Sequence, residues 1–309
     1  MAKKTVKATP PTRRATKKST NGSPTKTHDQ IVGLAQSVIK HIEAANNPTL
    51  KVPVRSISNV SFNKKKRIIE LGDSKSDRPF FDLGNAKRFM QTMLMSSELL
   101  KLQEQQKTAS IRDMFYRCKH TVEGSKEETF TDQSESDPVI EDLEVSLGTL
   151  REELRVFAEP RGAMVGPLIV RDVGDEIDLA RMGSGVWSVP SIVEPHVVQF
   201  VRNKAKFILL IEKGAVWSRF NEDRFWEKHK CMIVHGGGQP PRGVRRLCHR
   251  MVKELKLPIY VLVDNDPWGY YIYSVVKQGS INLAFESSRM AIPSARFIGM
   301  SSYDAAEFD

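Results

Sequence analysis

Residues 258–269 of the chain read Pro-Ile-Tyr-Val-Leu-Val-Asp-Asn-Asp-Pro-Trp-Gly. The apolar part of this stretch, from Ile259 to Val263, has the length of a buried β-strand, and the residues after it indicate a turn into a helix. Two further apolar runs, at 207–211 and 231–234, are separated from it and from each other by segments with helical periodicity. Strands that alternate with helices predict a parallel sheet with right-handed crossovers, which places this part of the chain in the α/β class.

The predicted sheet carries acidic residues where its strands end. Glu212 directly follows the first run, and Asp264 and Asp266 follow the third. Functional groups of open α/β sheets gather at the carboxyl ends of strands, and carboxylate oxygens are ligands that suit Mg²⁺. The sequence therefore predicts a magnesium site at Glu212, Asp264 and Asp266. The alternative is that Asp264 or Asp266 only caps the helix that begins near Pro267.

The chain before residue 180 has a different pattern. Helical spacing predicts five helices in it, at about 30–46, 85–107, 111–120, 136–147 and 150–157. Ser110 caps the third of them, and Gly148 makes a tight turn between the last two. Strand-like pieces at 162–170 and 176–179 have the character of a wing. Helices joined by a glycine turn and followed by a wing predict a winged-helix (CAP-like) domain.

Tyr116 is the candidate nucleophile within this winged helix. A tyrosine hydroxyl is a weak nucleophile at its free pKa of about 10, so it requires a cation or a metal nearby to stabilise the phenolate. Arg112 lies four residues earlier on the same face of the predicted helix, and Arg117 and Lys119 are close in sequence. The other interpretation is that Phe115 and Tyr116 pack in the core.

A second group of basic residues lies between the second strand and the helix after it. Residues 235–243 read His-Gly-Gly-Gly-Gln-Pro-Pro-Arg-Gly, and Arg242, Arg245 and Arg246 stand in or just after this loop. A glycine-rich loop beside arginines can approach a phosphate backbone closely, so we predict that the three arginines bind nucleic acid. A solvated helix face is the alternative. The Gly-Lys-Ser/Thr of a Walker loop does not occur in this stretch.

Cysteine and histidine residues near the loop do not predict zinc. Cys231, His235, Cys248 and His249 do not match the spacing of a structural zinc site, and Cys231 falls in a predicted buried strand. Three cysteines are too few for a disulfide framework, which predicts a reducing, intracellular environment.

Length and charge limit the possible domain organisation and the possible binding partners. A chain of 309 residues is long enough for two domains, and it contains no run of about 18 apolar residues that predicts a membrane span. Residues 1–28 hold eight basic and no acidic residues, which leaves 39 basic against 37 acidic residues for the rest. Such a tail has too few apolar residues to fold, and it either binds a polyanion or keeps the protein in solution.

Three motifs together resemble a known family. The motif Ile111-Arg-Asp-Met-Phe-Tyr116 is similar to the catalytic tyrosine motif of the A subunit of archaeal DNA topoisomerase VI, which is shared with the meiotic double-strand-break protein. Ile211-Glu-Lys-Gly214 and Val263-Asp-Asn-Asp-Pro-Trp-Gly269 resemble the two motifs of the Toprim domain in that family. Residues 236–246 resemble its glycine-rich segment, and the resemblance covers about residues 30–309 in the family's order.

The resemblance implies a DNA-cleaving A subunit of a type IIB topoisomerase. Tyr116 would become linked to a 5′-phosphate, Arg112 would hold the scissile phosphate, and the three acids would bind Mg²⁺. In this family the tyrosine of one subunit meets the metal site of its partner, which implies a homodimer that cuts both strands of double-stranded DNA. Strand passage would require an ATPase B subunit in an A2B2 heterotetramer, because the chain has no visible ATP-binding motif.

We therefore expect a basic tail at 1–28, a winged-helix domain at 29–180 with the catalytic tyrosine, a linker at 181–204 and a Toprim domain at 205–309. The family usually continues beyond the equivalent of residues 302–304, so we expect a fragment or a short variant. The resemblance also implies a cytoplasmic, nucleoid-associated protein of an archaeal-type cell, with no membrane partner.

Three other functions compete with this interpretation. The first is a programmed double-strand-break protein that cleaves without strand passage, and the second is a non-catalytic DNA-binding winged-helix protein. The third is a phosphatase of the haloacid dehalogenase type, because Val263-Asp-Asn-Asp266 resembles its nucleophile motif. Only 43 residues follow Asp266, which is too short for that domain.

Overall fold

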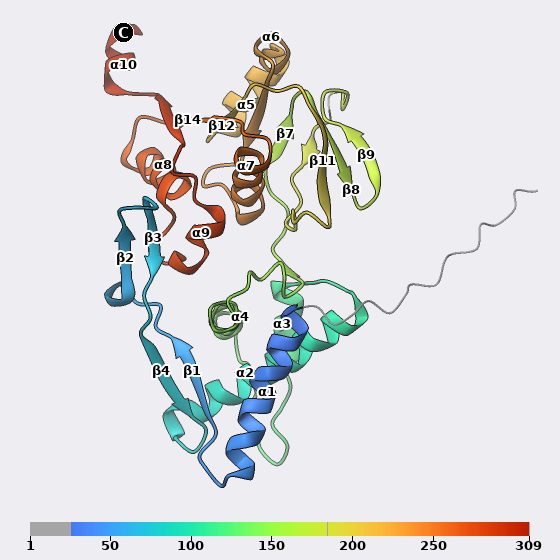
Figure 1. Ribbon diagram of the computed structural model, residues 1–309, viewed down its shortest axis with the longest axis vertical. Helices are drawn as coiled ribbons and strands as arrows, with labels where there is room; N and C mark the ends of the chain where they lie inside the picture. Colours follow the sequence, from blue (N-terminus) through green and yellow to red (C-terminus); the bar gives the residue numbers. More distant parts are fainter. Residues whose placement is uncertain (1–25, 184, 309) are drawn as a thin grey trace, which may run out of the picture.

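The computed structural model describes residues 26–183 and 185–308. The chain forms two units (Figure 1): a helical unit built mainly from the first half, and an α/β unit built from the second half. The expected basic tail lies outside the described residues up to position 25, and its last part is helical, because α1 already begins at Lys26.

Four helices form the core of the first unit, and all four were predicted. They are α1 (Lys26–Glu43), α2 (Leu83–Gln105), α3 (Ile111–Cys118) and α4 (Gln133–Leu147). Asp82 caps α2 by accepting a hydrogen bond from the Asn85 N–H, and Ser110 caps α3 in the same way. Their apolar faces meet in one cluster around Met95, Leu99 and other fully buried side chains.

Two details of the helical prediction are wrong. Helix α4 begins a turn earlier than expected, because Asp132 caps it and Pro138 lies inside the helix. Residues 151–155 form turns instead of a helix, and Arg155, with a left-handed φ of 65°, ends them. The chain then enters a short strand, β6 (Val156–Phe157), which pairs in parallel with β5 (Ala109–Ser110).

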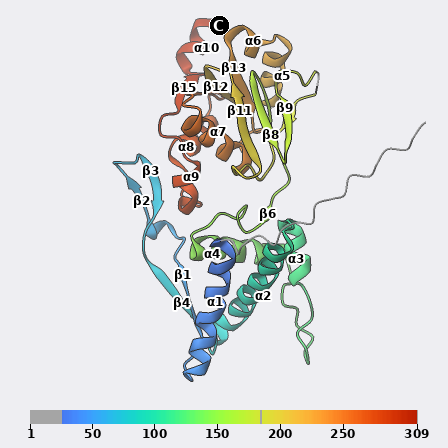
Figure 2. The same ribbon diagram turned by 45° about the vertical axis from the view of Figure 1, so that its right-hand side comes forward.

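An arm of β-hairpins connects α1 to α2. Strand β1 (Thr49–Pro53) pairs with β4 (Lys75–Pro79), and β2 (Val60–Asn63) pairs with β3 (Ile68–Leu71), both antiparallel. Asn59, in the 3-10 turn η1 (Ile57–Asn59), joins the two pairs, because its side-chain amide donates to the Val54 carbonyl oxygen. The arm reaches upward, so that β2 and β3 lie beside the α/β unit (Figures 1 and 2).

The second unit is built on a six-stranded sheet in the order β10-β7-β13-β12-β14-β15. Four neighbouring strands, β13, β12, β14 and β15, are parallel, which confirms the predicted α/β fold. Strands β7 and β10 extend the sheet in antiparallel orientation. The strand bounds are β7 (Ala163–Val165), β10 (Trp187–Ser188), β12 (Phe207–Ile211), β13 (Cys231–His235), β14 (Ile259–Leu262) and β15 (Arg296–Gly299).

Helices cover both faces of this sheet, which explains why its strands are continuous apolar runs. Along β12, Ile208 and Leu210 face one core, and Leu209 and Ile211 face the other. Side chains of α7 and α8 complete the first core, and Trp217 and other residues of α5 and α6 complete the second. The helices of this unit are α5 (Gly214–Glu222), α6 (Phe225–His229), α7 (Arg242–Glu254), α8 (Pro267–Gln278), α9 (Ser287–Met290) and α10 (Ser302–Phe308), with η2 (Ala284–Glu286) before α9.

The predicted wing belongs to this second unit, which corrects the expected domain boundaries. Strands β8 (Leu168–Asp172), β9 (Asp175–Asp178) and β11 (Val198–Asn203) form a three-stranded sheet whose buried residues join the core under α7. Residues 163–165 are part of the six-stranded sheet itself. The boundary therefore falls just after β6 rather than at 180. The expected linker at 181–204 contains β10 and β11 and is structured.

Candidate active site

Helix α3 presents Tyr116 to solvent. The buried side chains of α3 are Met114, Phe115 and Cys118, so Tyr116 falls on the opposite face, and 57% of its surface is exposed. The sequence left open whether Phe115 and Tyr116 are both core residues. The structure separates them: Phe115 packs inside, and the phenol of Tyr116 is accessible to a large substrate.

Arg112 contacts the phenol oxygen of Tyr116. One of its guanidinium nitrogens lies 3.5 Å from Tyr116 Oη, as the four-residue spacing on one helix face predicts. The hydrogen bond to Tyr116, followed by the charge of the phenolate, raises the pKa of Arg112 above its ordinary value. A phenol oxygen beside a permanent positive charge is the arrangement that a tyrosine nucleophile requires.

Glu212 and Asp264 meet at the carboxyl ends of neighbouring strands. Glu212 follows β12 and Asp264 lies just beyond β14, and the two strands are hydrogen-bonded in parallel. A Glu212 carboxylate oxygen accepts a hydrogen bond from the Asp264 backbone N–H at 3.1 Å. Glycine is required next to this pair, because a Cβ at Gly269 would lie 2.2 Å from the Asp264 carbonyl oxygen.

Asp266 has a different role in the structure. Its side chain accepts a hydrogen bond from the Gly269 N–H at 2.6 Å and caps α8, as the alternative interpretation of the sequence held. Within the part of the chain that the structure describes, no group of three or more acidic, histidine or cysteine side chains is arranged to hold a metal ion. The expected convergence of three carboxylates is therefore not found, and the close pair is Glu212 and Asp264.

Lys213 is a site residue that the sequence analysis missed. Its ammonium nitrogen lies 2.8 Å from Asp264 Oδ2, across the ends of β12 and β14. The hydrogen bond and charge of Asp264 raise the pKa of Lys213, and Glu212 and Asp266 add smaller contributions in the same direction. Its position directly after Glu212 was the one sign in the sequence that Lys213 belongs to the site. Adjacency in sequence, however, does not reveal that the lysine side chain contacts the aspartate after β14.

The tyrosine and the acids lie in different units of the chain. Helix α3 is part of the lower, helical unit, and strands β12 and β14 are part of the upper unit (Figures 1 and 2). No hydrogen bond, ion pair or ring contact among the described residues joins Tyr116 or Arg112 to Glu212, Asp264 or Asp266. Within the described part of a single chain, the tyrosine and its arginine therefore do not contact the acidic residues.

The three arginines of the glycine-rich connection are not on a DNA-binding surface, which corrects their predicted role. Their side chains are 12%, 6% and 16% exposed for Arg242, Arg245 and Arg246. Each guanidinium is paired with a carboxylate, so its charge is already compensated inside the protein. A buried, compensated arginine is not free to neutralise a phosphate.

Arg242 is the centre of this ionic network, and it joins the two units. It donates to Glu144 at the end of α4 at 2.7 Å, to Glu152 at 3.0 Å, and also contacts Glu286 in η2. Arg245 donates to the same Glu286 at 2.6 Å. We name Arg242, Arg245 and the three carboxylates the inter-unit cluster.

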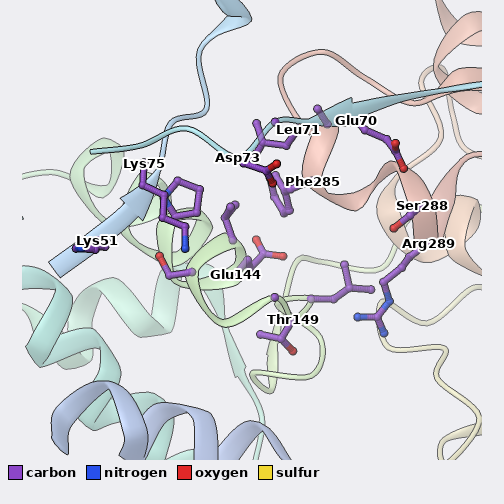
Figure 3. A pocket seen from close by; sticks show the side chains of 17 residues that line it. Lys51, Glu70, Leu71, Asp73, Lys75, Glu144, Thr149, Phe285, Ser288 and Arg289 are labelled. Atoms are coloured by element: carbon purple, nitrogen blue, oxygen red, sulfur yellow. The ribbon is translucent and has the colours of Figure 1, made fainter. Parts of the chain in front are cut away.

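A cavity of about 490 Å³ lies beside the inter-unit cluster. Figure 3 shows it lined by residues of the hairpin arm, of the end of α4 and of α9, with Lys75 and Arg289 on opposite sides. None of the residues predicted for catalysis, metal binding or DNA binding lines it. The Arg289 guanidinium is held by the Glu153 carboxylate through two hydrogen bonds of 2.7 Å.

Comparison with known proteins relates both units of the chain to the same family. Residues 207–309 match the family model for the Toprim domain of Spo11 and the topoisomerase 6 A subunit, and residues 87–156 match the model "Type IIB DNA topoisomerase". The chain is 42% identical over 286 residues to the type 2 DNA topoisomerase 6 A subunit of Pyrococcus abyssi, which covers 93% of this chain and 74% of the relative.

The chain belongs to the topoisomerase 6 A-subunit family. Its relative from Hyperthermus butylicus, also a type 2 DNA topoisomerase 6 A subunit, is 40% identical over 276 residues, covering 87% of this chain and 71% of the relative. The corresponding protein of Halobacterium salinarum is 33% identical over 291 residues, covering 92% and 78%. The Toprim match begins at Phe207, the first residue of β12, and includes both acids of the close pair.

The cysteines of this family member lie in its cores. Cys231 is fully buried in β13 and Cys248 is buried in α7, as was predicted for Cys231. Burial raises the pKa of both thiols to about 12. None of the helices in the described part of the chain combines the length and the apolar character needed to cross a membrane.

Proposed function

We propose that this chain is the DNA-cleaving A subunit of a type IIB topoisomerase, with Tyr116 as its nucleophile. The observation that carries the proposal is the Arg112–Tyr116 contact on the exposed face of α3, in a chain of the topoisomerase 6 A-subunit family. A helix face that exposes a phenol beside a guanidinium suits attack on a phosphodiester, which is large and negatively charged.

The chemistry follows from the groups that α3 presents. The Tyr116 oxygen gives its proton to solvent and forms a bond to phosphorus. The bond between phosphorus and the 3′-oxygen breaks, the 3′-oxygen takes up a proton from solvent and becomes a hydroxyl, and the 5′-phosphate stays on tyrosine. Arg112, at 3.5 Å from that oxygen, stabilises the phenolate and binds a non-bridging phosphate oxygen. Attack by the 3′-hydroxyl reverses the step, so the phosphotyrosine ester conserves the energy required for religation.

Glu212 and Asp264 are the residues proposed to hold Mg²⁺. Carboxylates at the ends of two adjacent parallel strands are donors that this ion prefers, and the pair fits it. Bound there, Mg²⁺ would supply positive charge for the leaving 3′-oxygen. Asp266 keeps a second carboxylate oxygen beyond the one that caps α8, and we assign it a supporting role.

We further propose a homodimer in which Tyr116 of one subunit works together with the acids of the other. The separation of α3 from β12 and β14 within one chain favours this arrangement (Figure 1). The relatives carry the name of an A subunit, which supports a partner B subunit. We propose an A2B2 assembly that uses the ATPase of B for strand passage. Since its proposed substrate is chromosomal DNA, we propose that the protein acts in the cytoplasm, at the nucleoid.

The test is covalent trapping. The full chain is mixed with its B subunit, Mg²⁺, a nucleotide and end-labelled duplex DNA, denatured, and separated on a gel. Wild type is expected to give protein-linked DNA with free 3′-hydroxyl ends, and Tyr116→Phe is expected to give none. Tyr303→Phe is the matched control, since Tyr303 is 89% exposed and lies outside the proposed site. Adduct formation by Tyr116→Phe at the wild-type level would overturn the assignment.

A further inference from the structure

Lys213 lies beside the two proposed metal ligands, at the carboxyl ends of β12 and β14. It follows Glu212 directly, occupies the cap position before α5, and extends its side chain across to Asp264. Its ammonium nitrogen is 2.8 Å from Asp264 Oδ2, while the Glu212 carboxylate faces the backbone of the same aspartate. A protein cation therefore contacts an oxygen atom that is a candidate metal ligand.

The charges around Lys213 are unbalanced. Lys213 pairs with Asp264, and it directly follows Glu212, whose carboxylate accepts a hydrogen bond from the Asp264 backbone N–H. One positive charge beside these two negative charges leaves a net negative charge, which attracts a divalent cation. A divalent cation bound to Asp264 Oδ2 would also repel an ammonium at hydrogen-bond distance from that oxygen. The two cations therefore compete for the same place.

The pair between Lys213 and Asp264 has the properties of a contact that can be exchanged. The two side chains are 59% and 41% exposed. Exposed pairs of this kind contribute a factor of only about 1.4 to 5 to an equilibrium constant. Lysine carries a compact charge on a flexible stem and can turn to another acceptor, whereas arginine would hold the carboxylate with a rigid fork.

We propose that Lys213 is the resting counter-ion of the metal site: it neutralises Asp264 before the divalent cation binds, and the cation displaces it. The released ammonium then binds a phosphodiester oxygen of the DNA, so that metal loading and DNA binding support each other. The inference rests on the proposed function, because it assumes that Glu212 and Asp264 bind a divalent cation.

The first test measures metal binding without DNA. Mn²⁺ is titrated calorimetrically into the full chain, and wild type is compared with Lys213→Met and with Lys228→Met, which removes an exposed positive charge from α6 in the same unit. Lys213→Met is expected to bind Mn²⁺ about 1.4- to 5-fold more tightly than wild type, because a competitor of that strength is removed. Lys228→Met is expected to match wild type. Unchanged or weaker Mn²⁺ binding by Lys213→Met would overturn the inference.

Asp264→Asn separates failure of the inference from failure of the proposed function. If wild type binds no Mn²⁺, or if Asp264→Asn binds it as well as wild type, the proposed metal site is wrong and the role of Lys213 falls with it. If Asp264→Asn loses binding while Lys213→Met binds as wild type does, the metal site stands and only the counter-ion role is wrong.

The second test measures the release of Lys213 toward DNA. Duplex affinity is determined at several salt concentrations in a Tyr116→Phe background, which prevents cleavage. With Mg²⁺ present, Lys213→Met is expected to lower the slope of log affinity against log salt by about 0.9, the contribution of one phosphate contact. Without Mg²⁺ the two slopes should agree. An equal loss of slope in both conditions would show that Lys213 contacts DNA without being displaced, and would refute the exchange.

Discussion

Replacement of Arg242 by methionine is expected to destabilise the protein through the inter-unit cluster. Methionine matches the aliphatic part of the side chain but removes the guanidinium group and its charge. The three carboxylates that contact Arg242 are almost inaccessible to water: Glu144 is 0%, Glu286 is 1% and Glu152 is 8% exposed at the side chain. Glu144 retains Arg151 and Glu286 retains Arg245, so the variant loses its central cation while its anions stay in place.

Breaking a buried ion pair by removing one partner destabilises a protein by about 3–5 kcal/mol, because an uncompensated charge remains buried. Arg242 contacts both units, so the loss should also loosen the chain where they join. For a unit of 150–250 residues, such a loss corresponds to a decrease in Tm of roughly 6–20 °C. We therefore expect Arg242→Met to unfold at a much lower denaturant concentration than wild type. Residues 158–160, exposed on the connection after β6, should be cut sooner in limited proteolysis.

The loss of stability in Arg242→Met should increase as the pH rises. Burial already holds the pKa of Glu144 above its ordinary value, although Arg242 and Arg151 act against this shift. A carboxyl group whose pKa is raised in the folded state favours folding below its unfolded pKa and loses that contribution as the pH rises through its folded pKa. Loss of Arg242 raises the folded pKa further. The stability deficit of Arg242→Met should therefore be largest near neutral pH and smaller near pH 5.

Arg219→Met is the matched control. Arg219 pairs with Glu222 on the surface, where the two side chains are 72% and 65% exposed. Surface pairs contribute about 0–1 kcal/mol, so this variant should unfold nearly as wild type does at every pH. Urea unfolding followed by circular dichroism at pH 5, 6 and 7 measures all three proteins. A deficit of less than about 1 kcal/mol for Arg242→Met, or one that does not change with pH, would refute the role of Arg242 as a buried inter-unit cation.

Three further predictions concern other parts of the chain. Burial, together with Lys253 and Arg246, lowers the pKa of His249 to about 4. Wild type should therefore lose stability as the pH falls from 6.5 to 4, by about 1 kcal/mol at pH 5.5, and His249→Gln should flatten this part of its pH–stability curve. Glu212→Gln should abolish Mg²⁺-dependent cleavage but keep metal-free DNA binding, and full cleavage by this variant would remove Glu212 from the metal site. Deletion of residues 1–25, which hold seven basic residues, should reduce the salt dependence of DNA binding by about 0.9 for each phosphate that the tail neutralises, and an unchanged slope would show that the tail does not touch DNA.

The α/β unit shows how far local pattern predicts a fold. The run at 207–211 is a buried strand because both of its faces are covered, and the sequence expresses this as an uninterrupted apolar run. Helix α3 was predicted from Ser110 and from the spacing of its apolar residues, and its cap follows from the same local rules. These features depend on neighbours within about four residues.

The wing prediction failed because strand-forming residues do not reveal their partners. Residues 162–179 do form strands, but β7 pairs with β13, about 70 residues later, and β8 pairs with β11. Periodicity indicates that a segment is extended, and it is the same whether the segment closes a winged helix or extends a second sheet. Only the tertiary pairing assigned the strands to the α/β unit.

Sequence alone determined the nucleophile candidate and the acidic strand ends. Tyr116 lies beside Arg112 because both are on one helix face, and Glu212 lies beside Asp264 because both follow adjacent parallel strands. The tertiary structure decided what the remaining charges do. Arg242 reads as a nucleic-acid ligand in the sequence, but its partners Glu144 and Glu152 lie 98 and 90 residues away. Charge type is local information, whereas compensation of a charge depends on which distant group the fold buries beside it. Water hydrates an exposed arginine, but a buried one requires a carboxylate, and only the packing of the two units supplies it.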